Sequence, residues 1–156
     1  MKPLRVYADT SVYGGVLDDE FAEASHTFFD QVRGGRFILA VSAVVGDELE
    51  GAPEEVGRLF DEMRRTAVAL EVSEEVLRLQ RAYLDASIVG TRWETDALHV
   101  ALAVVGQCRL IVSWNFKHIV NFQKIPLYNG VSQALGHGVI GIHTPQEVIV
   151  YEDEDV

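Results

Sequence analysis

The sequence is almost free of cysteine, with Cys108 as its single example in 156 residues. One cysteine excludes an internal disulfide bond and any metal site built from cysteines. Cys108 precedes an apolar segment, which indicates a buried and unreactive thiol. Any chemistry must therefore come from other side chains.

Long apolar runs are also missing. No segment approaches the roughly 18 consecutive apolar residues of a membrane-spanning helix. The N-terminus lacks the apolar core and cleavage site of a secretory signal, so we expect no membrane association and a cytoplasmic location. The hydrophobic fraction of 48% and the length of 156 residues fit one globular domain.

Positive charge is scarce, because 13 Lys and Arg residues stand against 24 Asp and Glu residues, giving a net charge of -11. Such a chain repels polyanions at long range, which argues against non-specific nucleic-acid binding and favours basic partners. Nucleic-acid chemistry stays open, because bound cations reverse the local charge of a carboxylate site.

The usual ligand motifs of α/β proteins are absent too. There is no Gly-x-Gly-x-x-Gly after the first expected strand and no Gly-x-x-x-x-Gly-Lys-Ser/Thr, which argues against dinucleotide and P-loop sites. No Gly-x-Ser-x-Gly nucleophile elbow is found either.

What the sequence does contain is an alternation of short apolar runs and helical patterns. Strands are expected at 4–8, 37–41, 68–72, 110–112 and 139–142. Helices are expected at 18–32, around 42–50, from 53, from 73, from 95 to 105, in a short piece from 116, and from 144, with a loop at 13–15 and no clear pattern at 123–130. Strict alternation predicts a three-layer α/β/α fold with a mainly parallel central sheet. Residues 1–150 form the single domain, and 151–156 form an acidic tail.

The stretch 93–119 organises this prediction. Its apolar residues at helical spacing end at Gly106, with Thr95 as the expected N-cap. Residues 110–112 then form an apolar run typical of a strand covered on both faces. Polar residues return at once after this strand, and Asn115 is among them.

Three carboxylates stand at element boundaries. Asp9 follows the first strand, Glu48 lies in the helix after the second, and Asp96 lies in the first turn of the later helix. Separately they fit a helix cap, a solvated residue and a carboxylate favoured by the helix dipole. Together at one sheet edge, beside Asn115, they indicate one site. Oxygen ligands select Mg²⁺ or Mn²⁺.

This pattern resembles the PIN domain and, within it, the VapC-like toxins of toxin–antitoxin pairs. Four stretches carry the resemblance over nearly the whole chain: 6–13, 42–49, 95–103 and 112–119. The resemblance implies a PIN-like fold and a magnesium-dependent ribonuclease with Asp9, Glu48 and Asp96 as its acidic centre. It also implies a homodimer and a basic antitoxin partner. Many relatives have aspartate where this chain has Asn115, so the fourth carboxylate is missing.

The supported chemistry is phosphodiester hydrolysis by a metal-activated water. Asp9 and Asp96 are expected as direct ligands, Glu48 as a ligand or an acceptor for metal-bound water, and Asn115 as a neutral oxygen donor. Weaker candidates are Thr10 and Ser11, which would orient the cluster or bind substrate, and Lys117 and His118, which would contact substrate phosphate. His99 is expected to be a core histidine and Trp114 a packing residue.

Two other functions remain open at this stage. A phosphatase would use Asp9 as its nucleophile, although such enzymes typically show Asp-x-Asp where this chain has Ser11. A non-catalytic binding module that has kept the fold would fit Asn115 and the acidic surface.

Overall fold

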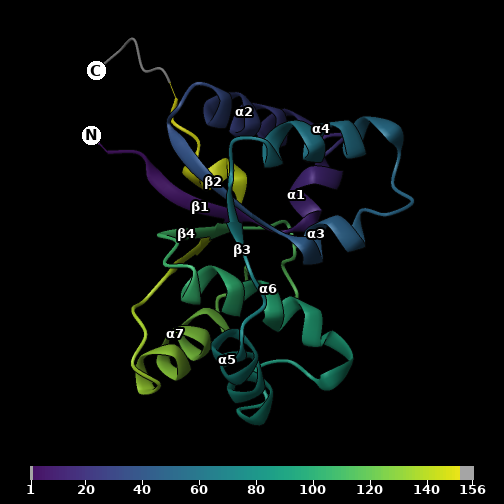
Figure 1. The fold of residues 1–156 in the computed structure, drawn as a ribbon. Coiled ribbons are helices and arrows are strands. Elements are labelled where there is room, and N and C mark those ends of the chain that lie inside the picture. Colours follow the sequence, from purple (N-terminus) through teal and green to yellow (C-terminus); the bar gives the residue numbers. More distant parts are fainter. Residues whose placement is uncertain (1, 152–156) are drawn as a thin grey trace.

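The computed structural model describes residues 2–151 and has a five-stranded sheet at its centre (Figure 1). The strands are β1 (Leu4–Ala8), β2 (Phe37–Ser42), β3 (Val68–Leu70), β4 (Leu110–Val112) and β5 (Gly141–His143). Their order is β3-β2-β1-β4-β5, and every pairing is parallel. The predicted parallel α/β fold is confirmed.

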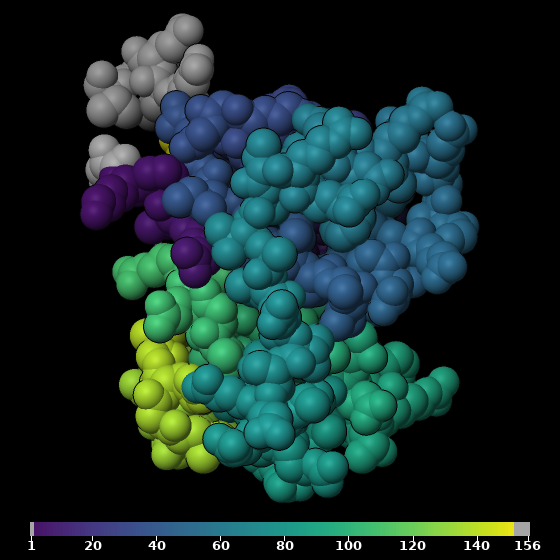
Figure 2. All heavy atoms as spheres, viewed as in Figure 1, coloured from purple at the N-terminus to yellow at the C-terminus, as the bar shows by residue number. Residues whose placement is uncertain are grey.

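Helices cover both faces of this sheet. On one side lie α1 (Thr10–Gly15), α2 (Ala22–Arg33), α4 (Glu54–Arg64) and the short α8 (Pro145–Val148), and on the other lie α5 (Glu74–Asp85), α6 (Glu94–Val105) and α7 (Ile125–Ala134) (Figure 1). Helix α3 (Ala43–Glu48) follows β2 at the edge of the sheet, and a 3₁₀ turn (Thr91–Trp93) leads into α6. In Figure 2 the segment from α4 through β3 to α5 lies over much of the visible face.

The central strands are buried on both faces, which explains their continuous apolar sequences. Val6, Tyr7 and Ala8 of β1 are fully buried, as are Ile111 and Val112 of β4. Helix α6 is also covered on most sides, because residues from Ala97 through Val104 are nearly all buried. His99, the polar residue within this buried stretch, therefore points into protein rather than water.

The order of the strands places a switch point between β1 and β4. The chain moves outward from β1 to β2 and β3, then returns to pair β4 with the other side of β1. Ligands of open parallel sheets bind at the carboxyl ends of the strands on either side of such a point. Asp9 and Ser113 are the first residues after β1 and β4.

Residues 13–15 form the end of a helix, not the expected loop, so that prediction is wrong. A Cβ atom at Gly15 would lie 2.6 Å from the Ser25 hydroxyl and 2.9 Å from the Trp114 indole nitrogen. Glycine is needed here because α1 packs closely against these two side chains, and not because the chain turns.

Several boundaries also differ from the prediction. Helix α6 begins at Glu94, so Thr95 lies inside it and is not its N-cap, and α2 begins at Ala22. Residues 116–119 form turns rather than a helix, and β5 begins at Gly141. The side chains of Ser42, Ser73 and Thr144 cap α3, α5 and α8. Of the expected acidic tail at 151–156, residues 152–156 lie outside the described residues.

Membrane spans were sought among the helices of residues 2–151, and none combines the length and the apolar character that crossing a membrane requires.

Candidate active site

Asp9 is held at the carboxyl end of β1 by two serine hydroxyls. It caps α1, where its Oδ1 accepts from the Ser11 backbone N–H at 3.1 Å and from the Ser11 hydroxyl at 2.5 Å. Its Oδ2 accepts from the Ser113 hydroxyl at 2.7 Å. Asp9 is only 4% exposed, and this burial raises the pKa of its carboxyl group, with a smaller contribution from Asp96.

The two serines connect Asp9 to the loop after β4. The Ser11 hydroxyl accepts from the Trp114 backbone N–H at 2.8 Å, and the Ser113 hydroxyl accepts from the Asn115 N–H at 2.9 Å. Each hydroxyl therefore links a backbone donor to the carboxylate and fixes its position across the β1–β4 switch point. Sequence reasoning expected Ser11 to orient the cluster, but it missed Ser113, whose only signal was its place directly after a buried strand.

Glu48 lies at the end of α3 and accepts two short hydrogen bonds on Oε1. The donors are the Thr10 hydroxyl and His99 Nε2, both at 2.6 Å. The bond from His99, and to a smaller extent the one from Thr10, hold the pKa of Glu48 below its usual range against the effect of partial burial. Thr10 thus orients a carboxylate, as expected for the cluster, and Glu48 is ionised at neutral pH.

His99 lies at the centre of a chain of buried hydrogen bonds. A carboxylate only accepts, so His99 Nε2 carries the proton that is donated to Glu48. In a neutral imidazole Nδ1 then accepts from the Tyr7 hydroxyl at 2.7 Å, and Tyr7 accepts from the Ser42 hydroxyl at 2.8 Å. Ser42 in turn accepts from the Val45 N–H as the cap of α3. His99 is a satisfied core residue, as predicted, and it also orients Glu48.

Asp96 is half-buried in the first turn of α6. Burial raises the pKa of its carboxyl group, and the negative charge of Glu48 acts in the same direction. His118, the Asn115 side chain and His99 act against this rise. Asp96 therefore lies between Glu48 on one side and the loop after β4 on the other.

Asn115 lies beside Asp96, and its side-chain oxygen accepts two hydrogen bonds. The Oδ1 atom accepts from the backbone N–H groups of Lys117 at 3.2 Å and His118 at 2.9 Å, which fixes the turn that follows. The expected role of Asn115 as a neutral oxygen donor to a water or to substrate stays a prediction, and the same oxygen fixes the turn.

A cavity of about 470 Å³ opens beside these residues. Glu48, Asp96 and Asn115 line this cavity. Its lining also includes a group that we call the cationic wall: Arg92, Trp93, Lys117 and His118. The predicted substrate contacts Lys117 and His118 thus line the same space as two of the three carboxylates. Arg92 and Trp93 were not anticipated, because they precede the expected helix from 95 and belong to no motif.

The cationic wall is organised by Trp93. The Arg92 guanidinium lies 5.1 Å from the centroid of its ring and the Lys117 ammonium 5.6 Å, both within the range of cation–π attraction. The His118 ring stacks on Trp93 with a centroid separation of 4.5 Å and an interplanar angle of 28°.

His118 is nearly buried but lacks hydrogen bonds from its side chain. It is 7% exposed, and neither ring nitrogen has a partner within residues 2–151. A buried polar atom without a partner costs about 1–3 kcal/mol. Burial also lowers the pKa of His118 and so favours the neutral ring, although the negative charge of Asp96 acts in the opposite direction.

Trp114, by contrast, is a packing residue, as predicted. It is 8% exposed, donates from its indole nitrogen to Ser25 at 2.9 Å, and stacks on Phe21 at 4.2 Å.

The chemistry of the acidic centre fits a hard divalent cation. Its donors are all carboxylate oxygens, and mutual repulsion contributes to the raised pKa values of Asp9 and Asp96. Within residues 2–151, no three His, Cys, Asp or Glu side chains converge on a common point that could hold a metal ion. The acidic centre is therefore a set of neighbouring carboxylates whose side chains are not arranged around a single metal position.

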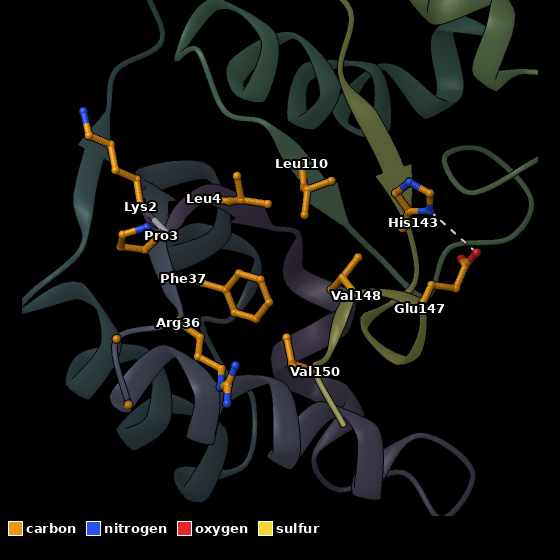
Figure 3. A pocket seen from close by; sticks show the side chains of 12 residues that line it. Lys2, Pro3, Leu4, Arg36, Phe37, Leu110, His143, Glu147, Val148 and Val150 are labelled. Carbon is orange, nitrogen blue, oxygen red and sulfur yellow. Dashed lines mark ion pairs between the residues drawn. The ribbon is translucent and has the colours of Figure 1, made fainter. Parts of the chain in front are cut away.

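A second cavity, of about 580 Å³, shares no residue with the acidic centre or the cationic wall. Figure 3 shows its apolar lining, which includes Leu4, Phe37, Leu110, Val148 and Val150. It offers no comparable grouping of carboxylates.

Comparison with known structures places the fold. The chain is similar to a chain in the crystal structure of VapBC2 from Rickettsia felis bound to a DNA fragment from their promoter, with a TM-score of 0.58 and 14% identity over 90% of this chain and 98% of that one. It is also similar to a chain of FitAcB from Neisseria gonorrhoeae, with a TM-score of 0.54 and 12% identity over 92% of this chain and 99% of that one. At these identities the likeness shows a shared fold.

No protein-family model matches the sequence, and no curated protein sequence does.

Proposed function

We propose that this protein is a metal-dependent ribonuclease that acts as the toxin of a toxin–antitoxin pair. The observation that carries the proposal is the acidic centre at the β1–β4 switch point, where Glu48 and Asp96 open onto one cavity. The resemblance of the four sequence stretches to VapC-like toxins supports it. The shared fold with chains of VapBC2 and FitAcB, over nearly their whole length, agrees with that resemblance.

In this proposal Asp9, Glu48 and Asp96 would hold Mg²⁺ or Mn²⁺. The bound cation would lower the pKa of a water that attacks the phosphodiester and would neutralise charge on the leaving oxygen. The protein supplies fixed ligands: Ser11 and Ser113 orient Asp9, and His99 orients Glu48. Outer partners of this kind restrict the rotation of metal ligands.

The acidic charge of the chain indicates the kind of partner that it would bind. The net charge of -11 and the exposed carboxylates favour a basic antitoxin segment that docks over the cavity and neutralises the acidic centre. We also propose a homodimer, as the resemblance implies. Antitoxin binding should weaken as salt is added, and the absence of any salt dependence would contradict this arrangement.

The test is cleavage of single-stranded RNA by the purified chain, with Mg²⁺ and with excess chelator. Asp9→Asn and Asp96→Asn should each lower cleavage by more than about a hundredfold, since loss of even an outer partner of a metal ligand costs roughly 10- to 100-fold. The matched control is Asp85→Asn, which removes the same charge from an exposed site at the end of α5.

Folding is checked in the same variants. Without metal, Asp96→Asn should melt at the wild-type temperature or above, because it relieves repulsion from Glu48. Wild-type cleavage by either variant would reject the acidic centre. Release of inorganic phosphate from monoesters, with no strand cleavage, would favour the phosphatase, and metal binding without either activity would favour a binding module.

A further inference from the structure

The cationic wall has no role in holding the metal, and it is an unusual feature of a chain with a net charge of -11. Arg92 and Lys117 are both exposed, yet both lie over the ring of Trp93 rather than beside a carboxylate. No ion pair within residues 2–151 involves either of them at 4.0 Å or less. Their charge is therefore free for an anion that enters the cavity.

His118 gives a second and independent indication of a ligand. A neutral imidazole has one donor and one acceptor, and both His118 nitrogens lack partners although the residue is 7% exposed. Buried polar groups are nearly always paired, and each exception calls for an explanation. The stacking on Trp93 holds this ring beside Arg92 and Lys117 at the cavity. A ligand that accepts a hydrogen bond from His118 would supply the missing partner.

A phosphate group has the required chemistry. Its oxygens accept charge-assisted hydrogen bonds from Arg and Lys and an ordinary one from an imidazole N–H. A carboxylate ligand would satisfy the same donors. Without a metal, the nearby Asp96 and Glu48 would repel a carboxylate and a phosphate alike, so this repulsion does not distinguish the two. A polynucleotide carries two phosphates one nucleotide apart, so that one would lie at the cationic wall while the next lies at the acidic centre.

We propose that Arg92, Lys117 and His118 form a subsite for the phosphate next to the scissile one, so that the substrate is a polynucleotide strand rather than a phosphomonoester or a mononucleotide. Trp93 is a positioning residue, because it holds the three side chains together without needing to touch the strand. The cleavage of the neighbouring phosphate rests on the proposed function, whereas the phosphate subsite rests on the cationic wall alone.

The first test measures binding of a short, labelled single-stranded oligoribonucleotide by fluorescence anisotropy, with the full-length Asp9→Asn chain in Mg²⁺ as the background so that the strand stays intact. Arg92→Gln and Lys117→Gln should each weaken binding roughly tenfold, as expected for one charge-assisted bond. Each should also reduce the slope of log K against log salt by about 0.7, the value for one phosphate on a single strand.

The matched control for Arg92→Gln is Arg109→Gln. Arg109 is also an exposed arginine, but it precedes β4 at the amino edge of the sheet, whereas the cationic wall lies beyond the carboxyl edge. Arg109→Gln removes the same charge at a site remote from the cavity, so strand affinity and the salt slope should stay unchanged. An equal loss in both variants would assign the effect to net charge and overturn the subsite.

The second test uses His118→Phe, which keeps a ring against Trp93 and removes both unpartnered nitrogens. Without ligand, this variant should melt at the wild-type temperature or higher, while strand affinity falls roughly tenfold, as for one lost hydrogen bond to phosphate. A histidine with a purely structural role would give the reverse result, with lower stability and unchanged affinity, and that result would overturn the proposal.

Cleavage by the chain without the Asp9 change separates this inference from the proposed function. If it cleaves RNA but the three substitutions leave KM and binding unchanged, the subsite is wrong and the function stands. If strand binding depends on the three residues but no cleavage occurs, the function is wrong and the subsite stands. Binding of a mononucleotide as tight as that of the strand would overturn the two-phosphate arrangement.

Discussion

The two histidines of the site are buried to nearly the same extent, yet their surroundings differ completely. His99 is 2% exposed and has a partner on each ring nitrogen, whereas His118 is 7% exposed and has none within residues 2–151. Burial alone therefore says little about the role of a polar side chain. The hydrogen bonds make His99 part of the fold, whereas the unpaired nitrogens of His118 are what the proposed phosphate subsite explains.

The difference follows from the elements that carry them. His99 projects from a helix against β1, where Tyr7 meets it at a fixed register. His118 lies in a turn whose shape is set by the Asn115 side chain, and an aromatic ring covers it without offering a polar group. Regular elements bring polar partners together, and the turn leaves His118 with a stacking contact alone.

The largest expected effect on stability comes from replacing His99, the histidine whose ring nitrogens both have partners. His99→Phe removes the acceptor for the Tyr7 hydroxyl and the donor to Glu48, and leaves the Tyr7 proton buried without a partner. We expect unfolding free energy to fall by about 2–4 kcal/mol. Urea denaturation checks this, and His118→Phe in the same experiment is the control with no expected loss. Equal losses at both positions would remove the distinction.

A double-mutant cycle measures how strongly Tyr7 and His99 are coupled. Tyr7→Phe alone should cost about 1–3 kcal/mol, because it leaves the His99 nitrogen unpaired. The double variant Tyr7→Phe and His99→Phe should cost less than the sum of the single changes, because replacing both partners by apolar groups leaves no unpaired atom between them. Strict additivity would show that the 2.7 Å contact carries no coupling energy.

The smallest expected effect is at the far end of the same chain of hydrogen bonds. Ser42→Ala removes the cap of α3 and the donor to Tyr7, and we expect a loss of about 1 kcal/mol. Ser73→Ala, which removes the matching cap of α5, serves as the control for capping alone. A loss no greater than at Ser73 would show that the bond to Tyr7 adds nothing to stability.

The sequence pattern was sufficient for the fold and for the edge of the sheet where the site lies. Apolar runs located the strands, and the polar residues at the ends of three of them, Asp9, Ser42 and Ser113, take part in the hydrogen bonds of the site. Local patterns failed where distant residues decide the conformation. The pattern at Gly15 is typical of a turn, but glycine is required there because Ser25 and Trp114, from other parts of the chain, leave no room for a Cβ atom.

The polar network was harder to predict than the carboxylates themselves. The Tyr7–His99 bond joins residues 92 positions apart, and the engagement of the Asn115 oxygen depends on the backbone of the turn after it. A periodic pattern cannot show which lone pair is occupied. The roles of Asp9, Glu48 and Asp96 in metal binding stay predictions.

The bond between Ser113 and Asp9 has a consequence for the time at which the site is made. These residues are 104 positions apart, so at synthesis rates of about 5–20 residues per second Asp9 waits roughly 5–20 seconds for the hydroxyl that orients it. The strand that carries Ser113 must also find its place beside β1, which is a slow, non-local pairing. A nascent chain thus carries Asp9 and Glu48 for seconds before Ser113 is made, so the acidic centre takes its final geometry only after most of the chain has been synthesised.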